Sequence, residues 1–356
     1  MEYFLAVFVA CLVLKYSCDS FEQSAGYLGR NMPAGIKGAT VNAVGSSMPE
    51  MMSAFALLFF YDDPALFAIA LGITAGSGVF NTAVIPSLAI LFAKDKDGYP
   101  VREISLDRKS LIRDVFWVVL SDVVLISLIF HGYISVFWAV ALNLVYVGYA
   151  IHLYIDAKRS GENEVEAYEE EVLKNYGNPI LNFLTCNFNQ LIFKGSRLNT
   201  RSALVILAIS ITVITLGSHL LVEGVIGSAD ILGIPGFISG LILGAAASSI
   251  PDTILSVKDA QKGEYEDAVA NPLASNTFDT SISVGLPLLI WLIWKGEAGI
   301  DIVGENMEAL RISVVSMSLA VGLTLIHKYK RITKGTALLL LGMYLVWGTW
   351  IFFTYA

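Results

Sequence analysis

Apolar segments long enough to cross a lipid bilayer recur along the whole chain. A membrane-spanning helix needs about 20 mostly apolar residues, and Pro, Gly and charged residues divide this sequence into ten segments of that kind. They lie at residues 2–18, 34–60, 64–93, 111–131, 133–156, 201–225, 234–258, 264–294, 306–327 and 333–354. We therefore expect an all-α, polytopic membrane protein with ten transmembrane helices.

The composition excludes several other classes of protein. Only 15% of the residues are charged and the mean hydropathy is +0.66, whereas soluble domains carry about 25% charged residues. A net charge of −8 without a basic stripe excludes nucleic-acid binding. No catalytic triad or phosphate loop is visible, and Cys11, Cys18 and Cys186 lack disulfide or metal-ligand spacing. We expect no enzyme activity, no cofactor and no obligatory protein partner, which leaves the bilayer and small inorganic cations.

The charged residues divide the chain into two halves and orient it. Residues 1–156 and 201–356 each hold five predicted helices, and the segment 157–200 between them is acidic. Of the 23 Lys and Arg residues, 21 lie in the odd-numbered connections or at their helix ends. Because basic residues near spans stay in the cytoplasm, we expect a cytoplasmic central loop and extracytoplasmic termini. The short loop favours a plasma (inner) membrane, and residues 2–18 lack the basic start of a cleaved signal.

The two halves share sequence motifs. Residues 45–50 (GSSMPE) match residues 247–252 (ASSIPD) at an offset of 202, and residues 76–81 (GSGVFN) match residues 274–279 (ASNTFD) at an offset of 198. Because each half has an odd number of predicted helices, the second repeat is inverted across the membrane. Inverted repeats are typical of secondary transporters, whose binding site lies near the bilayer midplane where the repeats meet.

Acidic residues within apolar helices mark the predicted site. Glu50 follows Pro49 and Asp252 follows Pro251, and each buried carboxylate costs about 2.5–3.5 kcal/mol on insertion scales. No Lys or Arg lies near either motif within its helix, so bound cations or protons have to offset that cost. Each proline also removes a backbone donor and frees carbonyl groups earlier in the helix.

All the candidate ligands around these acids are oxygen atoms. Carboxylates, carbonyls and hydroxyls suit hard cations such as Ca²⁺, Na⁺, K⁺ or Mg²⁺ better than Zn²⁺ or Cu⁺. The candidate metal ligands are Glu50, Asp252, Asp279, Asn81, Ser46, Ser47, Ser77, Ser248, Ser249, Ser275, Asn276 and the carbonyls near Ala43 and Ala245. Asp122 has no counterpart in the other half and is expected to be structural, whereas Glu22 and Glu223 fit capping and ion entry equally well.

These paired motifs resemble the alpha repeats of the sodium/calcium exchanger superfamily of Ca²⁺/cation antiporters. The strings most similar to its potassium-dependent Na⁺/Ca²⁺ exchangers are residues 45–50, 76–81, 249–252 and 284–287. The resemblance implies a central divalent site at Glu50 and Asp252. It places monovalent sites at the surrounding serines and at the carbonyls near Ala43 and Ala245. In the animal branch, an acid at the position of Asp279 accompanies potassium dependence.

The resulting hypothesis is a secondary antiporter that exchanges Na⁺ for Ca²⁺ by alternating access, with K⁺ co-transport left open. The alternatives are a Ca²⁺/H⁺ exchanger and an exchanger for Mg²⁺ or another divalent cation; a channel is disfavoured by the inverted repeat. Two departures from the family pattern bear on ion selectivity: Gly78 stands where many members have Asn, and Ser248 where Thr is commoner. The central loop is too short for large Ca²⁺-sensing domains.

Overall fold

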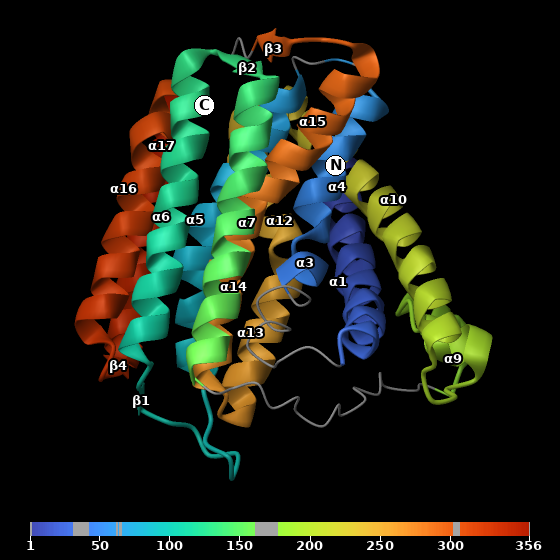
Figure 1. Ribbon diagram of the computed structural model, residues 1–356, viewed down its shortest axis with the longest axis vertical. Helices are drawn as coiled ribbons and strands as arrows, with labels where there is room; N and C mark the ends of the chain where they lie inside the picture. Colours follow the sequence, from blue (N-terminus) through green and yellow to red (C-terminus); the bar gives the residue numbers. More distant parts are fainter. Residues whose placement is uncertain are drawn as a thin grey trace.

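The computed structural model describes residues 2–30, 43–61, 63, 66–160, 177–301 and 307–355. In these residues the chain forms a bundle of long helices that run close to one common direction (Figure 1). The predicted all-α class is confirmed, because the described strands are only two or three residues long. The start of the predicted helix 34–60 and the Glu-rich run 161–172 lie outside the described residues.

Helices cover every predicted apolar segment as far as it is described. The first half contains α1 (Glu2–Leu28), α3 (Ala43–Ser46), α4 (Met48–Phe59), α5 (Phe67–Phe92), α6 (Arg108–His131) and α7 (Val136–Ser160). Two short helices follow, α8 (Pro179–Leu184) and α9 (Phe188–Phe193). The second half contains α10 (Thr200–Leu232), α11 (Gly236–Ser239), η3 (Gly240–Gly244), α12 (Ala245–Ser248), α13 (Ile250–Lys262), α14 (Tyr265–Phe278), η4 (Asp279–Ser283), α15 (Val284–Lys295), α16 (Met307–Lys328) and α17 (Lys334–Tyr355).

Three of the predicted helices are interrupted instead of continuous. A break at Ser47 separates α3 from α4, and a break at Ser249 separates α12 from α13. In both places a proline occupies the first turn of the following helix, where its missing N–H is tolerated. The π-helical turns η3 and η4 interrupt the segments 234–258 and 264–294. Such π-turns are frequent at functional sites.

The described helices identify a polytopic membrane protein. Six of them are long and apolar enough to cross a membrane, and the pair Gly236–Ser248 and Ile250–Lys262, bent by 41°, would make a seventh. Met48–Phe59 and Val314–Lys328 are apolar but shorter. The predicted number of ten crossings therefore stays a prediction.

Helix α5 lies at the centre of the bundle and joins the two halves. Within its most apolar window, 89% of the residues are buried, and it packs against η3, α12, α13 and α14. A Cβ atom at Gly72 would lie 2.5 Å from the Phe237 carbonyl oxygen, and one at Gly76 would overlap the Leu241 carbonyl oxygen. Glycine at these positions lets the two backbones touch, as is common between membrane helices.

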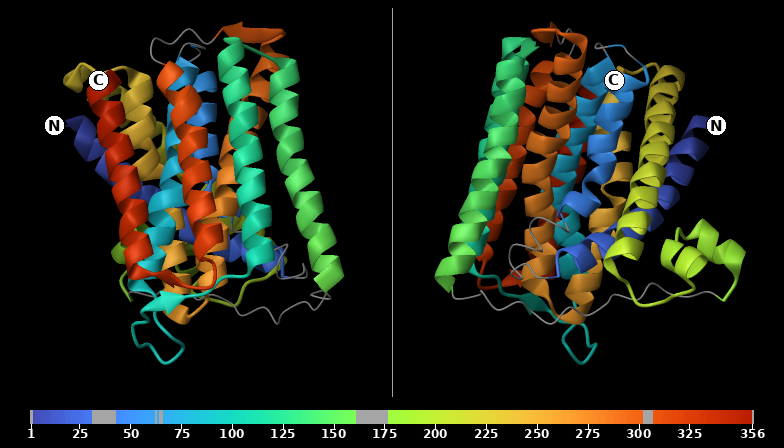
Figure 2. Two further views of the ribbon diagram at one scale, coloured as in Figure 1. Left: turned by 90° about the vertical axis from the view of Figure 1, so that its left-hand side faces the viewer. Right: turned by 45° about the vertical axis from the view of Figure 1, so that its right-hand side comes forward.

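Helices α1 and α10 pack against each other at one edge of the molecule, where α10 also contacts α4 (Figure 2). Glycines again permit the close approach, because a Cβ atom at Gly224 would lie 2.6 Å from Val7 Cγ2 and one at Gly217 would lie 3.1 Å from Leu14 Cδ2. The two helices come from equivalent positions in the two halves. Each half thus contributes its first helix to the same edge.

Two small strand pairs close opposite ends of the bundle (Figure 1). At one end β1 (Glu103–Ile104) pairs antiparallel with β4 (Ile332–Thr333), with Glu103 opposite Thr333. At the other end β2 (Tyr133–Ser135) pairs antiparallel with β3 (Gly299–Asp301), with Ile134 opposite Ile300. Each pair links the first half of the chain to the second.

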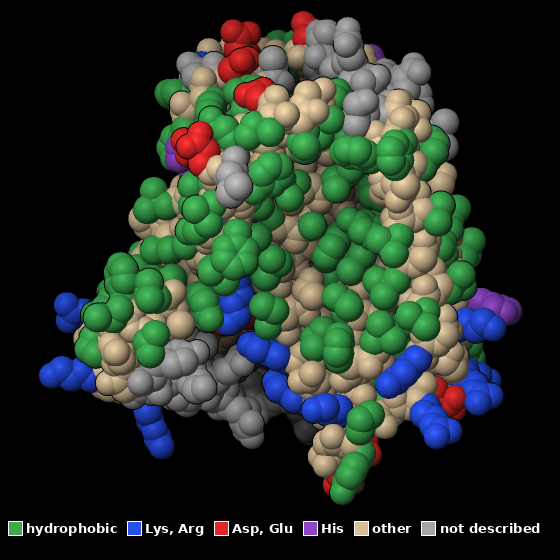
Figure 3. Space-filling view, turned by 180° about the vertical axis from the view of Figure 1, so that it is seen from behind, with side chains coloured by type: hydrophobic (Ala, Val, Ile, Leu, Met, Phe, Trp, Pro, Cys, Tyr) green, Lys and Arg blue, Asp and Glu red, His purple; other side chains and the backbone are tan. Residues whose placement is uncertain are grey.

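The two ends differ in charge. Lys and Arg side chains gather at the end that carries β1, β4 and α9, while Asp and Glu are more frequent at the opposite end (Figure 3). Green hydrophobic side chains cover much of the surface between them. This is the surface expected for a protein whose middle faces lipid.

Candidate cation site

Three carboxyl groups are buried at the interruptions of the broken helices. Glu50 lies in the first turn of α4, Asp252 in the first turn of α13, and Asp279 at the first position of η4. Their exposed fractions are 1%, 1% and 0%. Because the N-terminus of a helix carries a partial positive charge, Glu50 and Asp252 each gain partial compensation from their own helix.

The two halves build the break before the acid in the same way. The residue that caps the following helix is Ser47 in the first half, with φ −89° and ψ 2°, and Ser249 in the second, with φ −81° and ψ 5°. The motif repeat of the sequence is therefore also a repeat of backbone geometry. It places a carboxylate three residues after each break.

One hydroxyl connects acids from both halves. Ser77 Oγ on α5 lies 3.1 Å from Glu50 Oε1, 3.3 Å from Asp279 Oδ2 and 2.9 Å from Ser249 Oγ. A serine hydroxyl has a single hydrogen to donate, so it cannot satisfy both carboxylates at once. At least one of these charged oxygens needs another partner.

The second half repeats this contact. Ser275 Oγ donates to Asp252 Oδ1 at 2.9 Å and lies 3.3 Å from Ser46 Oγ of the first half. Thus Ser77 and Ser275, which are equivalent in the sequence repeat, each hydrogen-bond the acid of their own half and a serine of the other half.

Two amide side chains complete the cluster. Asn81 Nδ2 donates to Asp279 Oδ2 at 3.4 Å, and Asn276 Nδ2 donates to the Gly78 carbonyl oxygen at 2.7 Å. Several oxygen atoms of the cluster are buried and accept no hydrogen bond within the described residues. They are Ser47 Oγ, Glu50 Oε2, Asn81 Oδ1, Asp252 Oδ2, Asn276 Oδ1 and Asp279 Oδ1.

Unsatisfied buried oxygens are costly unless something binds them. None of the described Lys, Arg or His side chains forms an ion pair with Glu50, Asp252 or Asp279. In the described residues, no three His, Cys, Asp or Glu side chains are arranged to hold one metal ion.

The backbone carbonyl groups near the breaks differ in whether a backbone N–H group donates a hydrogen bond to them. The Ala43 and Ala245 carbonyl oxygens accept hydrogen bonds from the backbone N–H groups of Ser47 and Ser249, both at 3.1 Å. Ser248 Oγ also donates to the Ala245 carbonyl oxygen at 3.2 Å. The carbonyls four residues before the prolines, those of Gly45 and Ala247, lose the N–H donor that a regular helix supplies. Gly45 and Ala247 lie two residues after Ala43 and Ala245, and the predicted role of the carbonyls near Ala43 and Ala245 as ligands stays a prediction.

The other acidic residues lie apart from this cluster. Asp122 on α6 is 1% exposed, and neither of its carboxyl oxygens has a hydrogen-bond partner in the described part of the chain. Glu223 on α10 pairs with Nε2 of His219 at 3.4 Å. The side chain of Glu22 on α1 lies against Gly45, one residue before Ser46, because a Cβ atom there would be 2.9 Å from Glu22 Cγ. That contact connects α1 with the broken helix of the site.

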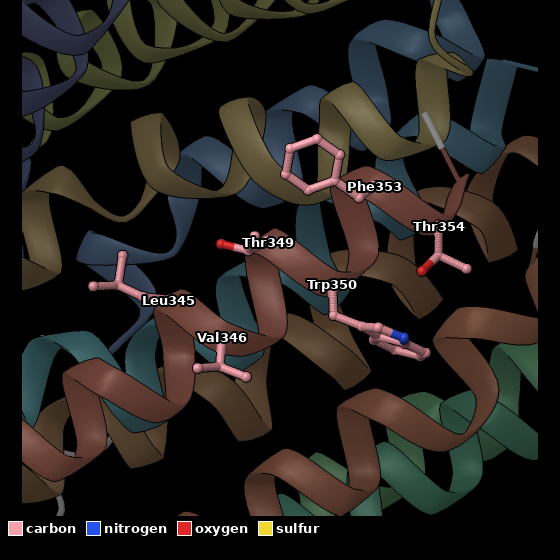
Figure 4. Close-up of a pocket in the computed structure, with 6 residues that line it drawn as sticks. All are labelled: Leu345, Val346, Thr349, Trp350, Phe353 and Thr354. Atoms are coloured by element: carbon pink, nitrogen blue, oxygen red, sulfur yellow. The ribbon is translucent and has the colours of Figure 1, made fainter.

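A shallow apolar depression lies along α17 (Figure 4). It is lined by Leu345, Val346, Thr349, Trp350, Phe353 and Thr354. None of these residues belongs to the predicted site. Its position and composition are those of a lipid-facing surface.

The chain is a polytopic helical bundle with carboxylates, hydroxyls and amides buried at broken helices of both halves. This is the architecture of an integral membrane protein and is typical of cation transporters. Comparison of the sequence with known families specifies the class further. The profile of the family described as "Sodium/calcium exchanger protein" matches residues 2–155 and 202–353, and the chain belongs to this family.

Individual relatives agree with this assignment. Inner membrane protein YrbG of Escherichia coli (strain K12) is 24% identical over 347 residues, which cover 95% of this chain and 93% of that protein. Human sodium/potassium/calcium exchanger 5 is 36% identical over 109 residues, or 29% of this chain. Chicken sodium/potassium/calcium exchanger 2 is 31% identical over 137 residues, or 38% of this chain. The matched segments span only 22% and 21% of these two exchangers.

Solved structures share the fold. The H⁺/Ca²⁺ exchanger CAX matches with a TM-score of 0.68 and 15% identity, over 97% of this chain and 81% of that chain. The sodium-calcium exchanger NCX_Mj matches with a TM-score of 0.57 and 21% identity, over 97% of this chain and 96% of that chain. The arrangement of helices is therefore that of known Ca²⁺ exchanger structures.

Proposed function

We propose that this protein is a secondary antiporter that exchanges Na⁺ for Ca²⁺ by alternating access to one shared site. The observation that carries the proposal is the cluster of Glu50, Asp252 and Asp279, fully buried, surrounded by hydroxyl and amide oxygens, and without an ion pair to any described Lys, Arg or His. Such an oxygen-only site suits hard cations. Membership in the sodium/calcium exchanger family supports these two ions as the cargo.

The ligands divide naturally between the two ions. Glu50 and Asp252, at the equivalent breaks of the two halves, would bind the divalent ion, and the serines at 46, 47, 77, 248, 249 and 275 would contribute to the monovalent sites with the nearby carbonyls. One divalent ion or several monovalent ions can neutralise the same carboxylates, but both sets cannot do so together. An empty site would retain buried negative charge, which is costly in the membrane. This mutual exclusion couples the two fluxes.

Asp279 is the candidate for a potassium contribution. It shares Ser77 with Glu50, so a cation bound at Asp279 would alter the hydrogen bonding of the divalent site. The sodium/potassium/calcium exchangers that match part of this chain support K⁺ as a co-transported ion.

A Ca²⁺/H⁺ exchanger is the second candidate. It is favoured by the structural match to the H⁺/Ca²⁺ exchanger CAX, and by carboxyl oxygens that could be protonated in place of binding Na⁺. In this case the same site would cycle protons. The cargo and the helix arrangement would be unchanged.

The proposed topology follows from the charge distribution. The basic end with β1, β4 and α9 would face the cytoplasm, and both termini would be extracytoplasmic (Figures 2 and 3). Residues 1–156 and 201–356 would form the two inverted repeats, with residues 157–200 as the cytoplasmic loop. The inner-membrane relative YrbG supports the plasma (inner) membrane as the location.

Flux measurements in liposomes distinguish the two candidates. Purified protein is reconstituted into vesicles loaded with Na⁺ or, separately, into vesicles with only a pH gradient, and uptake of radioactive Ca²⁺ is followed. We expect uptake driven by the Na⁺ gradient at constant pH. Uptake driven only by the pH gradient would replace Na⁺ by H⁺ as the coupling ion, and no Ca²⁺ flux under either gradient would contradict the proposal.

A further inference from the structure

The short helices α8 and α9 expose an unusual amount of apolar surface. Ile180, Phe183 and Leu184 on α8 are 68%, 67% and 61% exposed, and Leu181 and Ile192 are also exposed. We call residues 178–193 the α8–α9 hairpin. Unlike the exposed apolar residues of the long helices, these lie on helices of six residues each, which are too short to cross a bilayer.

Three of the four asparagines of the hairpin are buried, whereas Asn178 at its start is exposed. Asn182, Asn187 and Asn189 are buried, with exposed fractions of 4%, 4% and 7%. Asn187 Oδ1 accepts from the Gln190 backbone N–H at 3.1 Å, and Asn189 Nδ2 donates to the Ser196 carbonyl oxygen at 3.3 Å. A hairpin surrounded by water would expose its amides and bury its apolar residues. This reversed distribution indicates that an apolar phase covers the exposed side.

The hairpin is fixed to the membrane-embedded helices at the basic end of the molecule (Figures 1 and 2). Ser20 Oγ on α1 donates to the Cys186 carbonyl oxygen at 2.5 Å. Cys186 and Phe188 share a buried cluster with Ile206 of α10. The hairpin therefore packs against α1, eight residues before that helix ends, and against the first turns of α10.

Basic side chains adjoin the apolar surface. Lys194, Arg197 and Arg201 follow the hairpin directly, are exposed, and form no ion pair with the described residues. Apolar side chains beside unpaired Lys and Arg are the signature of a segment that lies in the interface of an anionic membrane. The basic and the apolar side chains together match an anionic lipid membrane as the partner of the hairpin.

We propose that the α8–α9 hairpin is an in-plane membrane anchor that inserts Ile180, Phe183 and Leu184 into one leaflet and binds anionic lipid headgroups through Lys194, Arg197 and Arg201. Because the hairpin contacts both α1 and α10, a leaflet that holds it also restrains the two helices at the edge of the bundle. The proposal depends only on these contacts and not on the identity of the transported ions.

Spin labelling tests the insertion directly. A nitroxide is attached at Phe183→Cys in the full-length protein, with the three native cysteines replaced by Ala, and reconstituted into vesicles of phosphatidylcholine with phosphatidylglycerol. The matched control is Tyr99→Cys, which is 70% exposed in the connection before β1. We expect the label at 183 to be accessible to oxygen and shielded from a water-soluble nickel chelate, with the reverse at 99. Equal exposure of the two labels to the nickel chelate would overturn the proposal.

A second measurement avoids replacing the cysteines. A photo-cross-linking amino acid at position 183 of the otherwise unaltered protein should yield lipid adducts, identified by mass spectrometry. Adducts with a second copy of the chain, or with another protein, would assign the surface to a protein partner and overturn the proposal.

The basic residues are tested by lipid selectivity. The triple change Lys194→Gln, Arg197→Gln and Arg201→Gln should lower retention of phosphatidylglycerol relative to phosphatidylcholine, by about fivefold in affinity for each Lys or Arg that faces the anionic surface. The control is Lys328→Gln with Lys330→Gln, two exposed Lys residues near β4. If the triple variant and the control retain the same lipids, the headgroup assignment is wrong.

Discussion

Ser77 is the residue on which the geometry of the site depends most. Its hydroxyl lies within hydrogen-bond distance of both Glu50 and Asp279. It also contacts Ser249 of the other half. A cation that binds Glu50 Oε1 or Asp279 Oδ2 has to share this hydroxyl or displace its hydrogen bond. The position therefore links the two acids and the two halves.

We predict that removing the Ser77 hydroxyl weakens Ca²⁺ binding. Ser77→Ala should weaken Ca²⁺ binding by about tenfold or more, because a buried hydrogen bond to a charged group contributes roughly 1.5–3 kcal/mol. Ser87→Ala is the matched control, since Ser87 lies on the same helix and donates only to the Ala83 carbonyl oxygen at 2.6 Å. Isothermal titration of the purified proteins with Ca²⁺ measures both. Equal affinities of the two variants would remove Ser77 from the site.

Asp279 supports a second prediction at this scale. Asp279→Asn keeps the size of the side chain and removes its negative charge, so a K⁺ ion bound there would lose its main ligand. If K⁺ is co-transported, Ca²⁺ uptake in liposomes should depend on K⁺ in the wild type and become independent of K⁺ in the variant. A K⁺ requirement that persists in Asp279→Asn would place the potassium site elsewhere.

At the scale of single elements, the contact between α5 and the η3–α12 segment is the tightest constraint on the fold. A Cβ atom at Gly76 would overlap the Leu241 carbonyl oxygen and lie 2.7 Å from Ala245 Cβ. Two residues further along the same helix, a Cβ atom at Gly78 would meet only Thr280 Cγ2, at 4.0 Å. A substitution at Gly76 therefore tests the packing of the two helices, whereas a substitution at Gly78 tests the effect of a new side chain on cation preference.

We predict opposite outcomes for the two positions. Gly76→Ala should reduce the yield of folded, monodisperse protein strongly, because backbone atoms cannot move aside as a flexible side chain can. Gly78→Ala should fold like the wild type, and Gly78→Asn should fold while changing the preference among cations. Size-exclusion profiles and melting temperatures in detergent measure the folding. A stable Gly76→Ala variant would show that the crossing is looser than described.

The sequence predicted where the long helices lie better than it predicted where they are interrupted. Apolar length alone located the helices, since a bilayer imposes that length. The segments 34–60 and 234–258 were each predicted as one helix, in which Pro49 and Pro251 indicated freed carbonyls, but the breaks at Ser47 and Ser249 were not located. The π-turn Asp279–Ser283 was not predicted either, because Pro272 and Pro287, which lie in the helices on its two sides, do not by themselves specify a π-turn. The α8–α9 hairpin was assigned to the loop, since six-residue helices carry little periodic signal.

For the molecule as a whole, the sequence repeat predicted that the halves meet at the acids, but not which groups meet. The offsets of 202 and 198 paired Glu50 with Asp252 and Ser77 with Ser275. They could not show that Ser77 reaches Ser249, or that Ser275 reaches Ser46, because contacts between halves depend on how α5 and α14 cross. The strand pairs at the two ends are likewise contacts between distant segments that no local pattern encodes.

The same contacts explain why the site requires both halves. Glu50 and Asp279 lie 229 residues apart in the sequence yet share the hydroxyl of Ser77. A movement of one half against the other would change the oxygens that surround a bound ion. The outer pair of α1 and α10 contains the first helix of each half, and Glu22 of α1 lies against Gly45 beside the site. This arrangement suits a transporter in which access alternates between the two ends.

The most direct test of this account measures Ca²⁺ uptake into Na⁺-loaded liposomes by the wild type, Glu50→Gln and Asp122→Asn. Both variants remove a buried membrane carboxylate, but only Glu50 hydrogen-bonds within the cluster, whereas Asp122 lies on α6 outside it. We predict that Glu50→Gln folds and loses Ca²⁺ uptake, while Asp122→Asn retains it. Sustained Ca²⁺ uptake by folded Glu50→Gln protein would contradict the assignment of these acids as the shared cation site.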